Sequence, residues 1–224
     1  MKFKSVIFDL DGTLLDSLPD IAESMNRVLE ELGYPTHPVD SYRYYVGEGI
    51  RELVKQAIPK EKFEHYSARV GDGDGFDLLV KKYRAIYDVQ WRKQSVPYRG
   101  IPEMLNALME RNIKIGILSN KLDDFTRQMV VELLPSWKFD VVLGSRPGIP
   151  LKPAPDSPLE IAKRMGTHPG EMAFIGDSGI DMQTAVNSKM NGIGVLWGFR
   201  EKEELIKSGA TYLIDHPMQL IELL

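Results

Sequence analysis

The chain has 224 residues, of which 43% are hydrophobic and 27% are charged, and its formal net charge is −4. This size predicts one large domain or a core with a smaller insertion, and the charge provides no overall basic field for binding nucleic acid. Because cysteine is absent, disulfides, thiolate catalysis and zinc–thiolate sites are excluded. The sequence shows no signal peptide and no apolar run near the roughly 20 residues of a membrane span. We therefore expect a cytoplasmic protein with no membrane partner, either a monomer or a homodimer.

The first predicted element is a short buried strand that ends in two acidic residues. Residues 6–8 are apolar, and Asp9, Asp11 and Gly12 follow them closely. Alternate side chains of a strand share a face, so the two carboxylates can converge where the strand ends. Repulsion resists the ionisation of both groups unless a cation or a proton-transfer task compensates it, and the pair therefore indicates chemistry. The alternative is that Asp11 is only a turn residue before Gly12.

Residues 18–91 show helical periodicity and no convincing strand, which predicts an inserted all-helical domain over residues 16–95. Gly33 follows the first apolar stripe in the position of a C-cap, and the glycine-rich run 71–75 predicts a loop. The three apolar stripes consist of Ile21, Met25, Val28, Leu29 and Leu32; of Ile50, Leu53, Val54, Ala57 and Ile58; and of Leu78, Leu79, Tyr83, Ile86 and Tyr87.

From residue 96 onward, predicted helices alternate with short, nearly continuous apolar strands. This alternation predicts a parallel sheet that is covered by helices on both faces. Residues 1–15 and 96–224 then form one discontinuous core domain, and the fold class is α/β: a Rossmann-like three-layer core with a parallel sheet plus an inserted all-helical cap domain. The expected helices cover residues 101–111, 124–134, 157–165 and 181–188, and the expected strands cover residues 113–118, 141–143, 172–175 and 193–197.

Four polar clusters each follow the carboxyl end of a predicted strand, where an open parallel sheet forms its ligand crevice. Carboxylates without cysteine or a suitably placed histidine favour a hard cation, and Mg²⁺ fits best. The ammonium group of Lys152 and the hydroxyl group of Ser119 favour an anionic group such as phosphate. The clusters are Asp9 with Asp11, Ser119 with Asn120 and Lys121, Lys152 alone, and Asp177 with Asp181.

Three of these residues also have a purely structural interpretation. Lys152 is alternatively a solvated loop lysine, and Ser119 is alternatively a helix N-cap. Asp181 is alternatively a carboxylate at a helix start, where the helix dipole favours negative charge. The shared position of all four clusters at strand ends favours the functional interpretation.

The motifs resemble those of the haloacid dehalogenase superfamily, in its phosphatase branch, and most of all those of its phosphoglycolate phosphatase group. With the helical insertion directly after the first motif, the resemblance covers essentially the whole chain. In family order, the four motifs are Asp-Leu-Asp-Gly-Thr-Leu at 9–14, Leu-Ser-Asn-Lys at 118–121, Leu-Lys-Pro-Ala-Pro at 151–155 and Gly-Asp-Ser-Gly-Ile-Asp at 176–181.

The resemblance implies a Mg²⁺-dependent phosphomonoester hydrolase with a nucleophilic aspartate. Asp9 would attack phosphorus, and Asp11 would act first as general acid and then as general base. Ser119 and Lys152 would hold the transferring phosphoryl oxygens, and Thr13 would orient Asp11. The implied metal-site residues are Asp9, Asp11 through its backbone carbonyl, Asp177, and Asp181 as a direct ligand or as support; the implied substrate- or phosphate-binding residues are Thr13, Asn120, Arg43 and Gly47.

The resemblance also implies a small phosphorylated metabolite as substrate, with phosphoglycolate as the first candidate. In the insertion, residues 46–50 are either a flexible helix start or a substrate-facing cap loop, because similar proteins often carry a Gly-x-Gly segment there. In the second case, Gly47 would face the substrate and Arg43 would meet a substrate carboxylate. A mobile cap would close over the site and exclude water.

Two enzymatic alternatives and one non-enzymatic alternative stay open. A phosphomutase of the β-phosphoglucomutase type is the nearest, although such mutases usually have valine where this chain has Thr13. A pyrophosphatase is the second. The non-enzymatic alternative is a receiver-like module that is phosphorylated on aspartate, but receivers are much shorter and have no helical insertion after the first strand.

Overall fold

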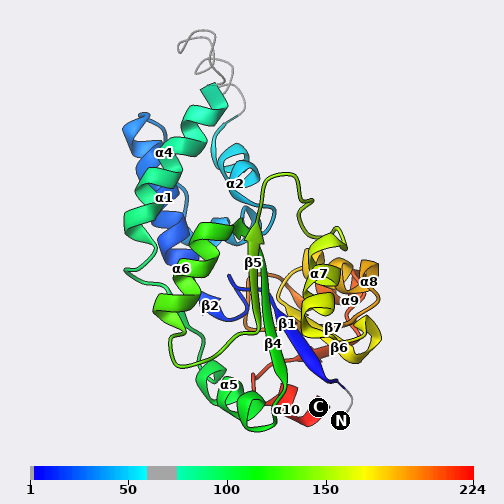
Figure 1. The fold of residues 1–224 in the computed structure, drawn as a ribbon. Coiled ribbons are helices and arrows are strands. Elements are labelled where there is room, and N and C mark those ends of the chain that lie inside the picture. Colours follow the sequence, from blue (N-terminus) through cyan, green and yellow to red (C-terminus); the bar gives the residue numbers. More distant parts are fainter. Residues whose placement is uncertain (1–2, 60–74) are drawn as a thin grey trace. The chain divides into compact units, whose positions relative to one another are not determined.

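The computed structural model describes residues 3–59 and 75–224, and the chain divides into two compact units. The first unit comprises Met1–Asp16 and Val96–Leu224, and the second unit comprises Ser17–Ser95. The first unit is thus discontinuous in sequence. Figure 1 labels most of the elements of both units.

The first unit is built on a six-stranded sheet in which every neighbouring pair of strands is parallel. The spatial order is β5-β4-β1-β6-β7-β8. The chain therefore builds one half of the sheet outward from β1, then crosses to β6 and builds the other half, so that the order reverses between β1 and β6. The strands are β1 (Ser5–Phe8), β4 (Lys114–Leu122), β5 (Val141–Ser145), β6 (Met172–Gly176), β7 (Asn191–Val195) and β8 (Tyr212–Ile214).

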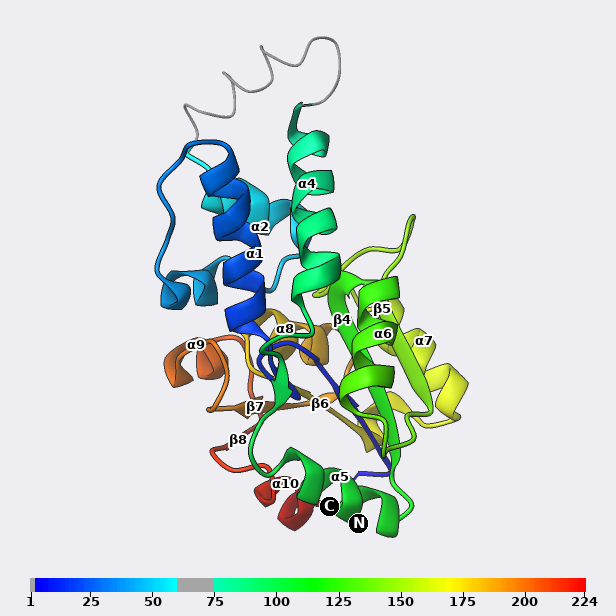
Figure 2. The ribbon, with the colours of Figure 1, turned by 90° about the vertical axis from the view of Figure 1, so that its left-hand side faces the viewer.

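Helices cover both faces of this sheet, as the strand–helix alternation predicts. Figure 1 shows α5 and α6 on one side of the sheet and α7 and α8 on the other. In Figure 2, which is viewed from the side of α5 and α6, α6 lies in front of β4 and β5. This arrangement confirms the predicted α/β class. The helices are α5 (Ile101–Glu110), α6 (Asp123–Leu133), α7 (Asp156–Met165), α8 (Gly179–Asn187), α9 (Lys202–Lys207) and α10 (Gln219–Leu223).

The strand β4 is longer than the sequence pattern predicts. The apolar run ends at Leu118, but pairing with β5 resumes after an irregularity, where Leu122 lies opposite Ser145. Ser119, Asn120 and Lys121 therefore lie within the strand rather than beyond it. The elements β8, α9 and α10 were also not expected from the sequence, since they are short and weakly periodic.

Two short strands join the segments where the chain leaves and re-enters the first unit. The strand β2 (Leu15–Asp16) pairs antiparallel with β3 (Val96–Pro97), with Asp16 opposite Val96. Before β2 the chain turns at Gly12, whose φ of +85° favours glycine.

The second unit is helical throughout its described part. Apolar side chains of α1 and α4, such as Met25 and Tyr83, are buried in it. Gly33 takes a φ of +71° directly after the end of α1, as its predicted capping role requires. Gly75 already belongs to α4, and the rest of the predicted loop, 71–74, lies outside the described residues. The helices are α1 (Leu18–Glu31), the 3₁₀ helix η1 (Val39–Tyr44), α2 (Ile50–Ala57) and α4 (Gly75–Gln90).

None of the helices within residues 3–59 and 75–224 combines the length and the hydropathy that crossing a membrane requires.

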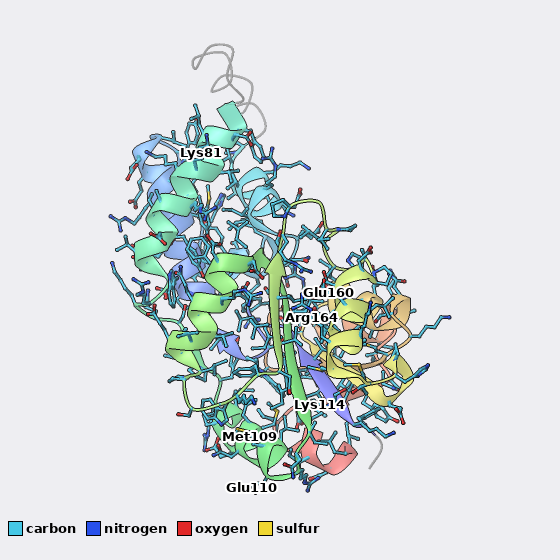
Figure 3. All side chains as sticks on the ribbon, viewed as in Figure 1. Lys81, Met109, Glu110, Lys114, Glu160 and Arg164 are labelled. Atoms are coloured by element: carbon cyan, nitrogen blue, oxygen red, sulfur yellow. The ribbon has the colours of Figure 1, made fainter. Side chains whose placement is uncertain are left out.

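A charged network on α7 fixes the connection from β5 to this helix. The guanidinium group of Arg146, just after β5, donates to both carboxylate oxygens of Glu160 (3.1 and 2.6 Å), and Arg164 pairs with Glu160 from one turn further along α7. Figure 3 shows Glu160 and Arg164 on α7, together with Lys114, whose ammonium group donates to the carbonyl of Met165. Hydrogen bonding from Arg146 lowers the pKa of Glu160. The start of the loop between β5 and α7 is thus tied to α7.

A buried carboxylate joins the two ends of the second unit. Asp20, in the first turn of α1, is fully buried. One of its oxygens accepts hydrogen bonds from the backbone N–H groups of Gln94 (2.9 Å) and Ser95 (2.8 Å) and from the Ser95 hydroxyl (2.8 Å), and the other accepts from Gln90 (3.3 Å). The start of the insertion is therefore hydrogen-bonded to its end.

We predict that Asp20→Ala destabilises the protein by about 3 kcal/mol, because it leaves buried N–H and O–H donors without their charged acceptor. Thermal denaturation should show a loss of roughly 10 °C in Tm. Asp40→Ala is the matched control, since the Asp40 side chain is 94% exposed. Equal Tm values for the two variants would contradict the assigned role of Asp20.

Candidate active site

The polar residues of the candidate site lie where the parallel strands end. Asp9 follows β1 and Asp177 follows β6, the two strands between which the sheet order reverses. Ser119 lies in the last part of β4, and Lys152 lies between β5 and α7. All four residues are buried, with at most 8% of their surface exposed. The structure therefore brings together residues from four distant segments of the sequence.

Three carboxylates form the acidic centre of this site. Among the residues that the structure describes, Asp9, Asp177 and Asp181 each offer a carboxylate oxygen, and these oxygens lie within 4.8 Å of one another. Oxygen donors of this kind are what Mg²⁺ prefers.

The ammonium group of Lys152 lies between two of these carboxylates. Its Nζ is 2.8 Å from Asp9 Oδ1 and 2.7 Å from Asp181 Oδ1. Burial lowers the pKa of Lys152, but the charges of Asp181 and Asp9 outweigh burial and raise it above the usual range. The side chain is therefore a buried cation stabilised by two carboxylates, not a solvated loop lysine.

Asn120 fixes the backbone of Lys152. Its side-chain oxygen accepts from the Lys152 N–H group (2.8 Å), and its side-chain nitrogen donates to the Lys152 carbonyl (3.1 Å). This pair of bonds holds the loop after β5 against the end of β4. The predicted contact of Asn120 with phosphate stays a prediction.

Asp177 is held from two sides. Thr13 donates its hydroxyl to Asp177 Oδ1 (3.1 Å), and the backbone N–H group of Phe199 donates to Asp177 Oδ2 (2.8 Å). The sequence assigned Thr13 to the orientation of Asp11, whereas in the structure its hydroxyl orients Asp177. Both oxygens of Asp177 are thereby fixed in direction.

Asp181 has its oxygens engaged within the protein. Oδ1 accepts from Lys152, and Oδ2 accepts from the N–H group (3.1 Å) and the hydroxyl (2.6 Å) of Ser178. Ser178 also caps α8 in a reciprocal capping box with Asp181. Asp181 thus acts both at the helix start and on Lys152, and its predicted part in metal binding stays a prediction.

Asp11 is paired with a cation that the sequence analysis did not assign. Lys121 Nζ lies 3.0 Å from Asp11 Oδ2, and both side chains are only about one-tenth exposed (10% and 9%). The signal available in the sequence was the place of Lys121 in the polar cluster with Ser119 and Asn120 at the end of a predicted strand.

The charge balance of the site fits a divalent cation. The four carboxylates of Asp9, Asp11, Asp177 and Asp181 face two ammonium groups, those of Lys152 and Lys121. If all are ionised, two negative charges remain uncompensated. A hard cation bound by Asp9 and Asp177 would neutralise them.

Burial raises the pKa values of both acidic residues at the strand ends. For Asp9, burial and the charges of Asp181 and Asp177 outweigh the opposing charge of Lys152, so that its pKa is well above the usual range. For Asp177, burial and then the charge of Asp181 raise the pKa to about 7, against the hydrogen bonds from Phe199 and Thr13. Without a cation, these carboxylates are therefore energetically costly in the ionised form.

Two further predicted residues belong to the second unit. Arg43 lies in η1, with its Nε atom 4.0 Å from Asp40. Gly47 and Gly49 take φ values of +122° and +90° before α2. The contacts of Arg43 and Gly47 with substrate stay predictions.

The segment that follows β7 also contacts the site, although it was not predicted from the sequence. Trp197 donates its indole N–H group to the carbonyl of Thr13 (3.0 Å), and Phe199 contacts Asp177 as described above. The sequence feature that could have indicated this segment is its position after a predicted strand. Positions 197–199 carry no titratable side chain, so nothing else in the sequence marked them as part of a site.

Comparisons with known proteins extend over most of the chain. Residues 6–195 match a family model described as haloacid dehalogenase-like hydrolase. A phosphoglycolate phosphatase of Aquifex aeolicus is 28% identical over 219 residues, which covers 98% of this chain and 95% of that protein. A phosphoglycolate phosphatase of Nitrosospira multiformis is 30% identical over 211 residues, which covers 92% of this chain and 88% of that protein.

Solved structures share the fold. A candidate phosphoglycolate phosphatase from Lactobacillus delbrueckii subsp. bulgaricus has a TM-score of 0.86 at 31% identity, and the match covers 99% of this chain and 98% of that chain. A candidate haloacid dehalogenase-like hydrolase from Bacteroides fragilis has a TM-score of 0.85 at 24% identity, with 97% and 99% covered. The second match bears on the fold alone. The resemblance read from the four motifs is thus confirmed.

The raised pKa of Asp177 predicts how the stability of the metal-free protein depends on pH. A carboxyl group with a raised pKa in the folded state stabilises the fold at low pH, and this contribution is lost as the pH rises through about 7. Asp177→Asn cannot ionise, so we expect its Tm relative to that of the wild type to be higher near pH 8 than near pH 5.5.

Thermal denaturation in EDTA at both pH values measures this difference. Titrating groups far from Asp177 are common to both proteins and cancel in the comparison. Asp9 does not cancel, because the charge of Asp177 raises its pKa, and loss of that charge favours the variant at high pH in the same direction. A Tm difference that is equal at the two pH values would contradict the raised pKa of Asp177.

Proposed function

This chain belongs to the haloacid dehalogenase-like hydrolase family, and from that premise we propose that it is a Mg²⁺-dependent phosphatase that acts on a small phosphorylated metabolite. In sequence and fold the chain is phosphoglycolate phosphatase-like. The observation that supports the proposal best is the convergence of Asp9, Asp177 and Asp181 around the ammonium group of Lys152. Anionic and cationic groups in one buried site suit a metal ion and a phosphoryl group together.

Asp9 is the proposed nucleophile. Its carboxylate oxygen forms a bond to phosphorus while the bond from phosphorus to the leaving oxygen breaks, and Asp11 gives a proton to that oxygen. Water then attacks the aspartyl-phosphate, the bond between phosphorus and the Asp9 oxygen breaks, and Asp11 takes up the proton of the water. The enzyme returns to its first state with free phosphate released.

Cationic and hydroxyl groups offset the charge of the phosphoryl oxygens. A carboxylate that approaches a phosphate dianion is repelled by it, and the ammonium group of Lys152 reduces this repulsion at short range. The hydroxyl of Ser119, at the end of the neighbouring strand, is the proposed second donor. Lys152 also holds Asp9 Oδ1 at 2.8 Å, which fixes the direction of the nucleophile.

The proposed metal site consists of the Asp9 and Asp177 carboxylates and the Asp11 backbone carbonyl, with Asp181 as support. When bound, Mg²⁺ supplies positive charge that neutralises the acidic cluster and the phosphoryl oxygens. Asp177 is already oriented by Thr13 and by the Phe199 N–H group. These contacts fix its oxygens before any ligand binds.

The proposed first substrate is phosphoglycolate, which is what the names of the Aquifex aeolicus and Nitrosospira multiformis relatives state for those proteins. We propose that residues 16–95, which include the whole second unit, form a helical cap domain. Arg43 and Gly47 are its proposed substrate-facing residues. Arg43 would bind the substrate carboxylate. A cap of this kind excludes water until the phosphoryl group has been transferred.

The alternatives differ in what accumulates during the reaction. A phosphomutase would give an isomerised sugar phosphate rather than free phosphate, and a pyrophosphatase would prefer inorganic pyrophosphate. A receiver-like module would stop at one phosphoryl group per chain. A panel of phosphorylated metabolites and pyrophosphate, assayed with Mg²⁺, separates all four.

We predict that Asp9→Asn lowers kcat by about a thousandfold or more, because an amide cannot form the aspartyl-phosphate. Phosphate release from phosphoglycolate and from p-nitrophenyl phosphate measures the loss, and thermal denaturation checks that the fold is kept. Asp88→Asn, an exposed aspartate on α4, is the matched control. Substantial turnover by Asp9→Asn would exclude Asp9 as the nucleophile.

We predict that Arg43→Ala raises KM for phosphoglycolate about tenfold and changes KM for p-nitrophenyl phosphate little, since only the first substrate carries a carboxylate. Arg27→Ala, at an exposed position of α1 in the same unit, controls for the loss of one positive charge. If both substrates lose affinity equally, or neither does, Arg43 does not recognise the carboxylate.

A further inference from the structure

The segment that follows β7 contacts the acidic site at several points. It begins at Leu196, whose N–H group donates to the carbonyl of Ile214 in β8 (2.9 Å). It continues through Trp197, Gly198, Phe199 and Arg200 to α9. It lies beyond residues 6–195, the part of the chain that matches the family model.

Trp197 ties this segment to the turn that carries the proposed nucleophile. Its indole N–H group donates to the carbonyl of Thr13 (3.0 Å). The hydroxyl of Thr13 in turn donates to Asp177 (3.1 Å). The indole of Trp197 therefore fixes the residue that orients one oxygen of Asp177.

Gly198 lies against both acidic loops with no room for a side chain. A Cβ atom at this position would be 2.2 Å from the Cβ of Asp177 and 2.5 Å from the carbonyl oxygen of Gly12. Both distances are far below van der Waals contact, so Asp177 or the Gly12 turn would have to move. Glycine at this position is what permits the close approach.

Phe199 completes the hold on Asp177. Its backbone N–H group donates to Asp177 Oδ2 (2.8 Å), while Thr13 holds Oδ1. Phe199 is only 4% exposed, and its burial anchors the backbone that makes this bond. The carboxylate of Asp177 is thus clamped between the turn after β1 and the segment after β7.

The same segment also reaches the start of α8. Arg200 lies 3.5 Å from Glu204, and Glu204 accepts a hydrogen bond from the N–H group of Gly179 (2.8 Å). Gly179 is the first residue of α8, two residues before Asp181. The segment is therefore connected to both loops that carry the acidic cluster.

We propose that residues 196–204 form a brace that sets the orientation of Asp177 and thereby the affinity of the site for Mg²⁺. This inference rests on the metal site of the proposed function. Trp197, Gly198 and Phe199 are positioning residues, because they act through Asp177 and Thr13. Hydrogen-bond partners of metal ligands typically change metal affinity 10- to 100-fold when they are removed.

The test is the Mg²⁺ affinity of the resting protein, measured by isothermal titration calorimetry with Mg²⁺ alone. Gly198→Ala is expected to weaken Mg²⁺ binding roughly tenfold or more. Gly170→Ala is the matched control, since a Cβ there would meet its nearest atom at 3.4 Å, an ordinary contact. In turnover assays, Gly198→Ala should need more Mg²⁺ for half-saturation, while kcat at saturating Mg²⁺ recovers to near the wild-type value.

If Gly198→Ala does not fold, Trp197→Phe decides. This change keeps an aromatic ring and removes the donor to Thr13 together with part of the indole. A weakening of about threefold or more in Mg²⁺ affinity supports the brace, and an unchanged affinity overturns it. A folded Gly198→Ala protein with wild-type Mg²⁺ affinity overturns the brace alone. A wild-type protein that binds no Mg²⁺ overturns the metal site of the proposed function, and the brace with it.

Discussion

The ammonium group of Lys152 lies between the carboxylates of Asp9 and Asp181, at 2.8 and 2.7 Å, in a part of the molecule that water scarcely reaches. A buried charge is tolerated only where its partners are close and their remaining hydrogen bonds are satisfied. The surrounding structure meets this condition: Asn120 holds the backbone of Lys152, and Ser178 occupies the other oxygen of Asp181. If this cation were absent, the three carboxylates of Asp9, Asp177 and Asp181 would repel one another at the carboxyl edge of the sheet.

The sheet order explains why such distant residues meet. The strand order reverses between β1 and β6: the strands that follow β1 in the chain lie on one side of it, and those that follow β6 lie on the other. The connections after β1 and β6 therefore run to opposite sides and leave the carboxyl ends of these two strands open to a ligand. Asp9 and Asp177 follow these two strands, while Ser119 and Lys152 come from the next strands along, β4 and β5. The parallel topology therefore fixes where these side chains lie. The short loops fix the directions in which the side chains point.

Much of this could be predicted from the sequence, because strand ends and acidic motifs are local features. The alternation of apolar strands and helices is visible in residues 96–197, and Asp9, Lys152 and Asp177 each follow a strand. The pairing of Lys121 with Asp11 and the hydrogen bond from Thr13 to Asp177 could not be predicted, since these side chains meet only in three dimensions. The extent of β4 was underestimated because pairing, rather than hydropathy, carries the strand past Leu118. Gly198 gave no signal because its contribution is the absence of a side chain.

The hydrogen bonds of Asp20 have a consequence for how this protein tolerates change. They tie the first turn of α1 to Ser95, and β2 and β3 place Asp16 opposite Val96. The entry and exit of the insertion are thus neighbours, and local bonds hold them together. The entropic cost of closing this long loop depends only weakly on the number of residues in it. The segment between these two points can therefore be lengthened, shortened or replaced while the strands of the first unit keep their register.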